Sequence, residues 1–312
     1  MDLGRSNLDI FAETLLELAR QDRDVLVVTS DSRGSGKLTK YGETLPEQIV
    51  ELGIAEQNVI GISAGLASAG KKVFAASPAC FITARSFEQL KNDVAYSDQP
   101  VKIVGISAGV SYGALGATHH SIHDFAALRA IHNITIIAPA DNFETRETIK
   151  AIYAAPYPVY VRLGKAAIAH VHTEGDSFTI GKAAQIQDGR DLTFIACGET
   201  VPIAVAAAQG LATAGVTCRV LSMHTIKPLD EEAVRRAAAE TGAIITVEEH
   251  SVFGGLGEAC AAVLMQAGAG VPFKIVAFPN EHMVAGSQKE LLNHYGISPN
   301  GLAETARQLL HR

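Results

Sequence analysis

The stretch Glu51-Leu-Gly-Ile-Ala-Glu-Gln-Asn58, with the mainly apolar run that follows it to Gly70, predicts a helix that starts at one acid, Glu56. Small and apolar side chains precede Glu56 and recur after it at helical spacing. Burial in such surroundings would raise the pKa of the carboxyl and let it share a proton with a buried base. The alternative is a surface acid that the helix dipole favours in a first turn. On local sequence alone, this alternative is the commoner one.

Short β-rich runs alternate with amphipathic stretches along the chain, which predicts an α/β architecture with mostly parallel sheets covered by helices. In the first half we expect strands at 24–30, 73–77, 101–106, 134–138 and 159–162, and helices at 7–20, 57–69, 84–96, 122–131 and 142–155. In the second half we expect strands at 192–197, 218–222, 243–247 and 274–277, and helices at 201–214, 230–240, 256–267, 287–295 and 300–311.

The chain of 312 residues is long enough for two domains. The alternation is lost between residues 165 and 190, where turn sequences gather. We therefore expect two consecutive domains, 1–178 and 179–312, each built on a mostly parallel sheet. In the second domain, Gly254-Gly-Leu-Gly257 follows a strand and opens a helix but lacks the full dinucleotide-binding fingerprint. We interpret it as close packing of strand against helix.

Composition excludes several classes of partner. The formal net charge of -7 argues against nucleic acid, which needs a basic face. No basic run favours a membrane surface, and no apolar run reaches the ~20 residues of a membrane span. Four scattered cysteines indicate reduced core residues, and the N-terminus has no signal-peptide pattern. We expect a cytoplasmic protein.

Residues that could carry chemistry follow predicted strands. They are Asp31, the run from Ser77 to Phe81, the run from Ser107 to His119, and Lys165. In open α/β sheets, ligands bind beyond the carboxyl ends of the strands. The sequence therefore predicts a site among these loops. His119 and His123 have a spacing that could bind zinc on a helix, but a third ligand and the HExxH form are absent, so we expect no metal ligand set.

Five motifs, in order along the chain, resemble the pyrimidine-binding half of transketolase. They are Gly53-Ile-Ala-Glu-Gln-Asn58, Phe81 within the segment from Pro78 to Gln89, Gly116-Ala-Thr-His-His120, Pro139-Ala-Asp141, and Pro158-Val-Tyr-Val-Arg-Leu-Gly-Lys165. The resemblance runs from about Leu8 to the C-terminus. It implies a thiamine diphosphate-dependent transferase that moves a two-carbon ketol group from a ketose (phosphate) donor to an aldose acceptor.

The resemblance also implies roles for individual residues. Glu56 would bond the ring nitrogen of the cofactor's aminopyrimidine, Phe81 would stack on that ring, and Ile54 would make an apolar contact with it. Asp31 would lie near the thiazolium or the rim of the site, although a turn-forming Asp is an equal alternative. His119 would contact substrate oxygens. Without the resemblance, Phe81 would be interpreted as a core residue at the end of a strand, and Ile54 could equally be a core residue.

Three departures from the family pattern concern the substrate. Leu115 stands where the family has an Asp that reads the hydroxyl next to the carbonyl, so stereochemical discrimination should be weaker or built differently. Ser107 replaces a family His, and Lys165 replaces a phosphate-binding Arg, without that residue's bidentate fork. Arg33 and Arg162 are candidates to help Lys165 bind the phosphate, although the side chain of Arg162 could point away from the cleft. The usual pentose phosphates are therefore not the expected acceptors.

The family's other half, which carries the diphosphate and Mg²⁺ site, is not recognisable here, since the sequence has no Gly-Asp-Gly. The resemblance thus implies the C-terminal subunit of a split transketolase, active only with an N-terminal, diphosphate-binding subunit, with a heterotetramer as the simplest closed assembly. One alternative is the β-subunit of a 2-oxo-acid dehydrogenase, but the pair Thr118-His119 favours transketolase. The other alternative is a non-catalytic assembly subunit, but the presence of Glu56 and Phe81 argues against it.

Overall fold

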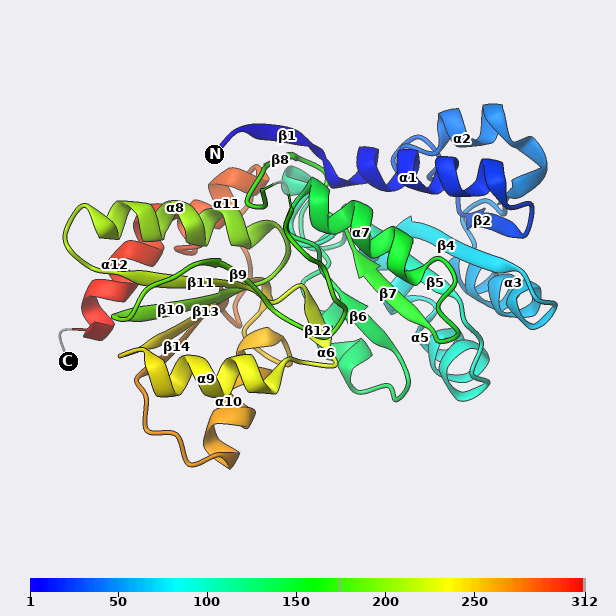
Figure 1. Ribbon diagram of the computed structural model, residues 1–312. Coiled ribbons are helices and arrows are strands. Elements are labelled where there is room, and N and C mark those ends of the chain that lie inside the picture. Colours follow the sequence, from blue (N-terminus) through cyan, green and yellow to red (C-terminus); the bar gives the residue numbers. More distant parts are fainter. Residues whose placement is uncertain (174, 311–312) are drawn as a thin grey trace.

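The computed structural model describes residues 1–173 and 175–310 and contains two α/β units (Figure 1). The first sheet has seven strands in the order β12-β6-β7-β5-β4-β2-β3. Neighbouring strands are parallel, except that β12 is antiparallel to β6. The strands are β2 (Val25–Thr29), β3 (Ile49–Glu51), β4 (Lys72–Pro78), β5 (Lys102–Ile106), β6 (Thr135–Ile137), β7 (Val159–Arg162) and β12 (Thr225–Lys227).

Helices cover both faces of this sheet, which is why its central strands are continuous apolar runs rather than alternating ones. One face carries α1 (Asn7–Gln21) and α7 (Asn142–Ile152), and α2 (Thr39–Thr44) packs beside α1. The other face carries α3 (Glu56–Ser68), α4 (Ala79–Ala84), α5 (Phe87–Gln89) and α6 (Asp124–Arg129). The single helix predicted at 84–96 was wrong in its bounds. The chain enters α4 directly after Pro78, and a π-helical turn spans Leu90–Tyr96.

The second sheet has five strands in the order β14-β13-β10-β11-β9, and only β9 is antiparallel. Its strands are β9 (Ala184–Gln187), β10 (Leu192–Ala196), β11 (Cys218–Ser222), β13 (Ile244–Ser251) and β14 (Phe273–Phe278). In Figure 1, α8 (Val201–Ala212), α11 (Gln288–His294) and α12 (Pro299–Leu310) lie on one side, and α9 (Glu231–Glu240) and α10 (Leu256–Gln266) on the other. None of the described helices is long and apolar enough to cross a membrane.

Two connections tie the two units together. Strand β12, from the second half of the sequence, forms an edge of the first sheet. One apolar core runs from the α3 side of the first sheet to the α9 and α10 side of the second. Within residues 1–178, strand β1 (Leu3–Ser6) pairs with β8 (Ala167–Ala169) in a separate antiparallel ribbon. The boundary between residues 178 and 179 remains our proposal for where one domain gives way to the next.

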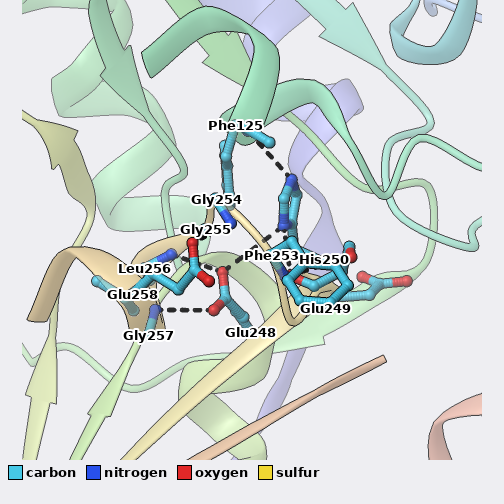
Figure 2. Close-up of polar contacts among 12 residues, drawn as sticks. Phe125, Glu248, Glu249, His250, Phe253, Gly254, Gly255, Leu256, Gly257 and Glu258 are labelled. Carbon is cyan, nitrogen blue, oxygen red and sulfur yellow. Dashed lines mark hydrogen bonds and ion pairs between the residues drawn. The ribbon is translucent and has the colours of Figure 1, made fainter. Parts of the chain in front are cut away.

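The loop that opens α10 also reaches the first unit (Figure 2). The Glu248 carboxylate accepts the backbone N–H groups of Leu256 at 2.7 Å and Gly257 at 2.8 Å, and so satisfies the helix start. A Cβ on Gly257 would lie 2.5 Å from the Ile275 side chain. The predicted close packing of strand against helix is therefore confirmed. Next to this loop, the His250 ring stacks on Phe125 of α6 with centroids 5.0 Å apart.

Candidate active site

The parallel strands bring four of the sequence-predicted residues to one edge of the first sheet. Asp31 follows β2, Phe81 follows β4, Ser107 follows β5 and Lys165 follows β7. These four strands are consecutive neighbours in the sheet and run in the same direction. Their carboxyl ends therefore form one continuous rim, which is where open α/β sheets bind ligands.

Glu56 is buried rather than on the surface. It is the first residue of α3, and only 4% of it is exposed. Its Oε2 lies 3.0 Å from Nη1 of Arg85, which donates a hydrogen bond to it across the start of the helix. The interpretation of Glu56 as an ordinary surface acid is therefore wrong. Arg85 was missed, although it stands four residues after Phe81, a spacing that puts two side chains on one helix face.

Phe81 is half-buried on α4 instead of ending a strand within the core. The Arg85 guanidinium carbon lies 4.4 Å from the centroid of its ring. The ring of His119 meets Phe81 in an edge-to-face arrangement, with centroids 5.3 Å apart. The structure thus links Glu56, Arg85, Phe81 and His119 through consecutive contacts, although residues 56, 81 and 119 are far apart in sequence.

Tyr112 extends this series toward Lys165. Its ring lies 5.4 Å from that of His119, again edge to face, and the Lys165 Nζ lies 5.4 Å from its centroid. Burial raises the pKa of Tyr112. Thr118 Oγ1 and His119 Nδ1 are 3.0 Å apart, which orients the imidazole. Tyr112 lies in the run from Ser107 to His119 that the sequence places at the site, but no motif assigns this residue a role.

The remaining predicted residues differ in how far they are buried and in what they contact. Leu115 ends a 3-10 turn, Gly113–Leu115, and is 59% exposed. Ser107 is buried and adopts a φ of 53° directly after β5. Asp31 is exposed in the loop after β2. In the same loop, Arg33 Nη2 lies 3.0 Å from Glu51 Oε2, so its charge is shared with an acid at the end of β3.

A cleft of about 380 Å³ opens beside Glu56 and is lined by Ile54, Ala55, Glu56, Gln57, Asn58 and Arg85. Ile54 is 75% exposed at its mouth. A buried carboxylate, an apolar rim and a nearby aromatic face suit a flat heterocycle that carries hydrogen-bonding nitrogens, and an aminopyrimidine is such a group. Within residues 1–173 and 175–310, no cluster of three or more His, Cys, Asp or Glu side chains is arranged to hold a metal ion.

Comparison with known proteins agrees with this geometry. Residues 5–170 match the family "Transketolase, pyrimidine binding domain", and residues 181–302 match "Transketolase, C-terminal domain". The chain is 52% identical over 303 residues to a subunit of the apulose-4-phosphate transketolase of Phocaeicola vulgatus, covering 97% of this chain and 96% of the relative. It is 34% identical over 304 residues to a 6-deoxy-6-sulfo-D-fructose transketolase subunit of a Clostridium species, covering 97% and 94%.

A solved structure described as a split gene transketolase, inactive beta4 tetramer, superposes with a TM-score of 0.88 at 32% identity and covers 99% of both chains. The transketolase of Campylobacter jejuni shares the fold, with a TM-score of 0.83 at 19% identity over 97% of this chain and 46% of that one. These relatives do not favour a 2-oxo-acid dehydrogenase or a non-catalytic subunit. The chain belongs to the transketolase family, as a thiamine diphosphate-dependent subunit that combines the pyrimidine-binding and C-terminal domains.

Proposed function

We propose that Glu56, Phe81 and His119 form the reactive centre through which this subunit transfers a two-carbon ketol group from a ketose phosphate to an aldose. One observation carries the proposal. A buried carboxylate at the start of α3, an aromatic ring on α4 and an imidazole after the 3-10 turn are joined by consecutive contacts of 3.0, 4.4 and 5.3 Å through Arg85. Three such groups at the rim of a parallel sheet form a site rather than a core.

Thiamine diphosphate, when bound, supplies the carbon nucleophile and the electron sink for the two-carbon unit. Glu56 would bond the ring nitrogen opposite the amino group and share a proton with that nitrogen. Because Glu56 is buried, its carboxyl is kept from bonding to water instead. Phe81 would orient the ring by stacking, a contact worth ~0.5–1.5 kcal/mol beyond area burial. Ile54 would exclude water at the mouth of the cleft, and Asp31 would stand at the outer rim.

His119 would bind the substrate's oxygens, since Thr118 and the rings of Phe81 and Tyr112 fix its orientation. Lys165 would hold the sugar phosphate as a point charge. We place three further side chains around the sugar: Ser107 at the end of β5, Leu115 on the 3-10 turn, and Arg33 at the periphery beside Glu51.

The donor we propose is a ketose phosphate other than the usual pentose phosphates. The 52% identical relative is named for apulose 4-phosphate, which makes that compound the first donor to test. Leu115 supports this choice, because an apolar side chain cannot accept the hydrogen bond of the hydroxyl that a family Asp would read.

The cofactor's diphosphate and Mg²⁺ would be held by a separate N-terminal transketolase subunit in a heterotetramer with two copies of each chain. Two observations support a partner. Ile54 stands 75% exposed over an open cleft, and relatives of full matching length are themselves named as subunits. The solved split gene transketolase, an inactive beta4 tetramer, also fits a requirement for a second chain. We place the complex in the cytoplasm, in carbohydrate metabolism.

The test is turnover by the complex reconstituted with its diphosphate-binding partner, thiamine diphosphate and Mg²⁺. Glu56→Gln should lower kcat by ~10²–10⁴-fold, the usual share of a positioned proton-sharing group. Glu88→Gln, an exposed acid on α5, should leave kcat unchanged. This chain alone should be inactive. Wild-type activity in Glu56→Gln, or turnover by the isolated chain, would overturn the proposal.

A further inference from the structure

We propose that Arg85 competes with the aminopyrimidine ring for Glu56 and Phe81, and therefore sets the affinity of the complex for thiamine diphosphate. This inference rests on the proposed function, because it takes those two residues to be the binding site of the ring. It adds Arg85, which lies in the motif from Pro78 to Gln89 but received no role from the sequence. Arg85 acts through the two side chains it touches, so it is a positioning residue rather than a catalytic one.

The geometry gives Arg85 both contacts at once. Its Nη1 donates to Glu56 Oε2 over 3.0 Å, and its guanidinium carbon lies 4.4 Å from the centre of the Phe81 ring. A guanidinium is flat, carries in-plane N–H donors and stacks on aromatic faces. An aminopyrimidine is also flat and stacks on aromatic faces, and its ring nitrogen would bond the Glu56 carboxyl by sharing a proton. A single arginine thus occupies both the carboxyl and the aromatic ring that the aminopyrimidine would use.

Arg85 and the aminopyrimidine ring cannot both contact Glu56 and Phe81 at the same time. Phe81 is half-buried, and Arg85 rather than Phe81 forms the wall of the cleft next to Glu56. The cofactor's ring reaches Phe81 only after the guanidinium has moved off it. A carboxylate oxygen that accepts a charge-assisted bond from Arg85 is also a poorer partner for a ring nitrogen. Binding of the ring therefore includes the cost of breaking the Arg85 contacts.

Arg85 is free to move. Its side chain is 51% exposed, whereas Glu56 is buried, so the mobile member of the pair is the arginine. It stands just after the end of α4, where its backbone N–H still bonds Phe81 O at 2.9 Å. Rotation about its side-chain bonds would release the guanidinium without disturbing α4 or α3.

The test is the dissociation constant of thiamine diphosphate for the reconstituted complex at fixed Mg²⁺, measured by calorimetry. Arg85→Ala removes both competing contacts, and Arg85→Met removes only the bond to Glu56. We expect thiamine diphosphate to bind roughly three- to tenfold more tightly to Arg85→Ala, with a smaller gain for Arg85→Met. This range corresponds to the stabilisation that exposed ion pairs and cation–π contacts usually provide. Lys91→Ala removes a charge from an exposed neighbour in the following turn and should leave the dissociation constant unchanged.

The thermal midpoint of the isolated full-length chain provides the second readout. Loss of Arg85 leaves the buried Glu56 without its partner, so the midpoint should fall while the cofactor binds more tightly. A merely structural arginine would lower the midpoint and not tighten binding. Equal or weaker binding by Arg85→Ala, with normal wild-type binding, overturns this inference alone. No binding of thiamine diphosphate by the wild-type complex overturns the proposed function, and this inference with it.

Discussion

Nε of Arg162 lies 2.9 Å from Oδ2 of Asp124, a buried ion pair of the first unit from which Arg162 also reaches the second unit. Arg162 stands on β7 of the first sheet, and its Nη2 donates to the backbone oxygen of Glu249 on β13 at 2.7 Å. Burial by itself would raise the pKa of Asp124, but the positive charge of Arg162, together with His250 and the Tyr160 hydrogen bond, holds that pKa below its ordinary value. The guanidinium of Arg162 is thus buried and bonded to protein groups on both units.

Replacement of Arg162 should destabilise the whole chain. Arg162→Met leaves Asp124 as an unpaired charge in the core, which typically costs about 3–5 kcal/mol. Urea unfolding followed by circular dichroism would measure the loss. The matched control is the double variant Arg162→Met with Asp124→Asn, which removes both charges and should recover part of the stability. A single variant no less stable than the double would show that the unpaired Asp124 charge does not destabilise the fold.

Glu199 makes stability depend on pH near neutrality. Burial, followed by the neighbouring Glu249 carboxyl, raises the pKa of Glu199 to about 8. The unfolded chain ionises this group at about 4.5. Its contribution to stability is therefore fully present below that pH and is lost as the pH rises toward 8. Glu199→Gln cannot ionise and should be more stable than wild type at pH 8, by on the order of 1–3 kcal/mol.

Thermal unfolding at several pH values between 5 and 8 would test this expectation. The difference between Glu199→Gln and wild type should be small at pH 5 and grow toward pH 8. Glu17→Gln replaces an exposed acid on α1 and should follow the wild-type profile. A constant offset between Glu199→Gln and wild type across the range would show that the carboxyl does not titrate there.

The long elements were predictable from sequence because each carries its own signal. Strands such as β2, β5 and β10 are buried apolar runs, and α1 and α9 are amphipathic over several turns. Several short elements were missed. Strand β12 has three residues, too few for any periodicity, and it exists because it pairs with β6 some ninety residues earlier in the chain. The ribbon of β1 and β8 depends on distant pairing in the same way.

The site was predictable where a motif or a strand end marked it. Motifs selected Glu56, Phe81 and His119, and in the fold consecutive contacts through Arg85 link these three residues, whose chemical roles are our proposal. Arg85 and Tyr112 were missed, because what they contact is decided by the tertiary structure. A long side chain such as that of Arg85 reaches several neighbours, and sequence spacing alone does not choose between Glu56 and solvent.

Lys165 should act on binding of the sugar phosphate more than on turnover. Lys165→Ala removes an exposed charge at the end of β7, so we expect the KM of a phosphorylated ketose to rise about five- to tenfold with little change in kcat. Lys165→Arg keeps the charge and should stay near wild type. Lys150→Ala, on the exposed side of α7, is the control for charge alone. An equal effect of Lys165→Ala on an unphosphorylated ketose would show that the residue does not read the phosphate.

Leu115 should decide which ketose is used. Leu115→Asp places a carboxylate on the 3-10 turn, four residues before His119, where we expect it to accept a hydrogen bond from the hydroxyl next to the carbonyl of a pentose phosphate. We expect kcat/KM for such a donor to rise roughly tenfold or more relative to that for apulose 4-phosphate, the worth of one hydrogen bond to a charged group. Ala114→Asp adds the same charge one exposed residue away and serves as the matched control. An unchanged ratio in Leu115→Asp, or an equal change in both variants, would mean that position 115 does not read the sugar.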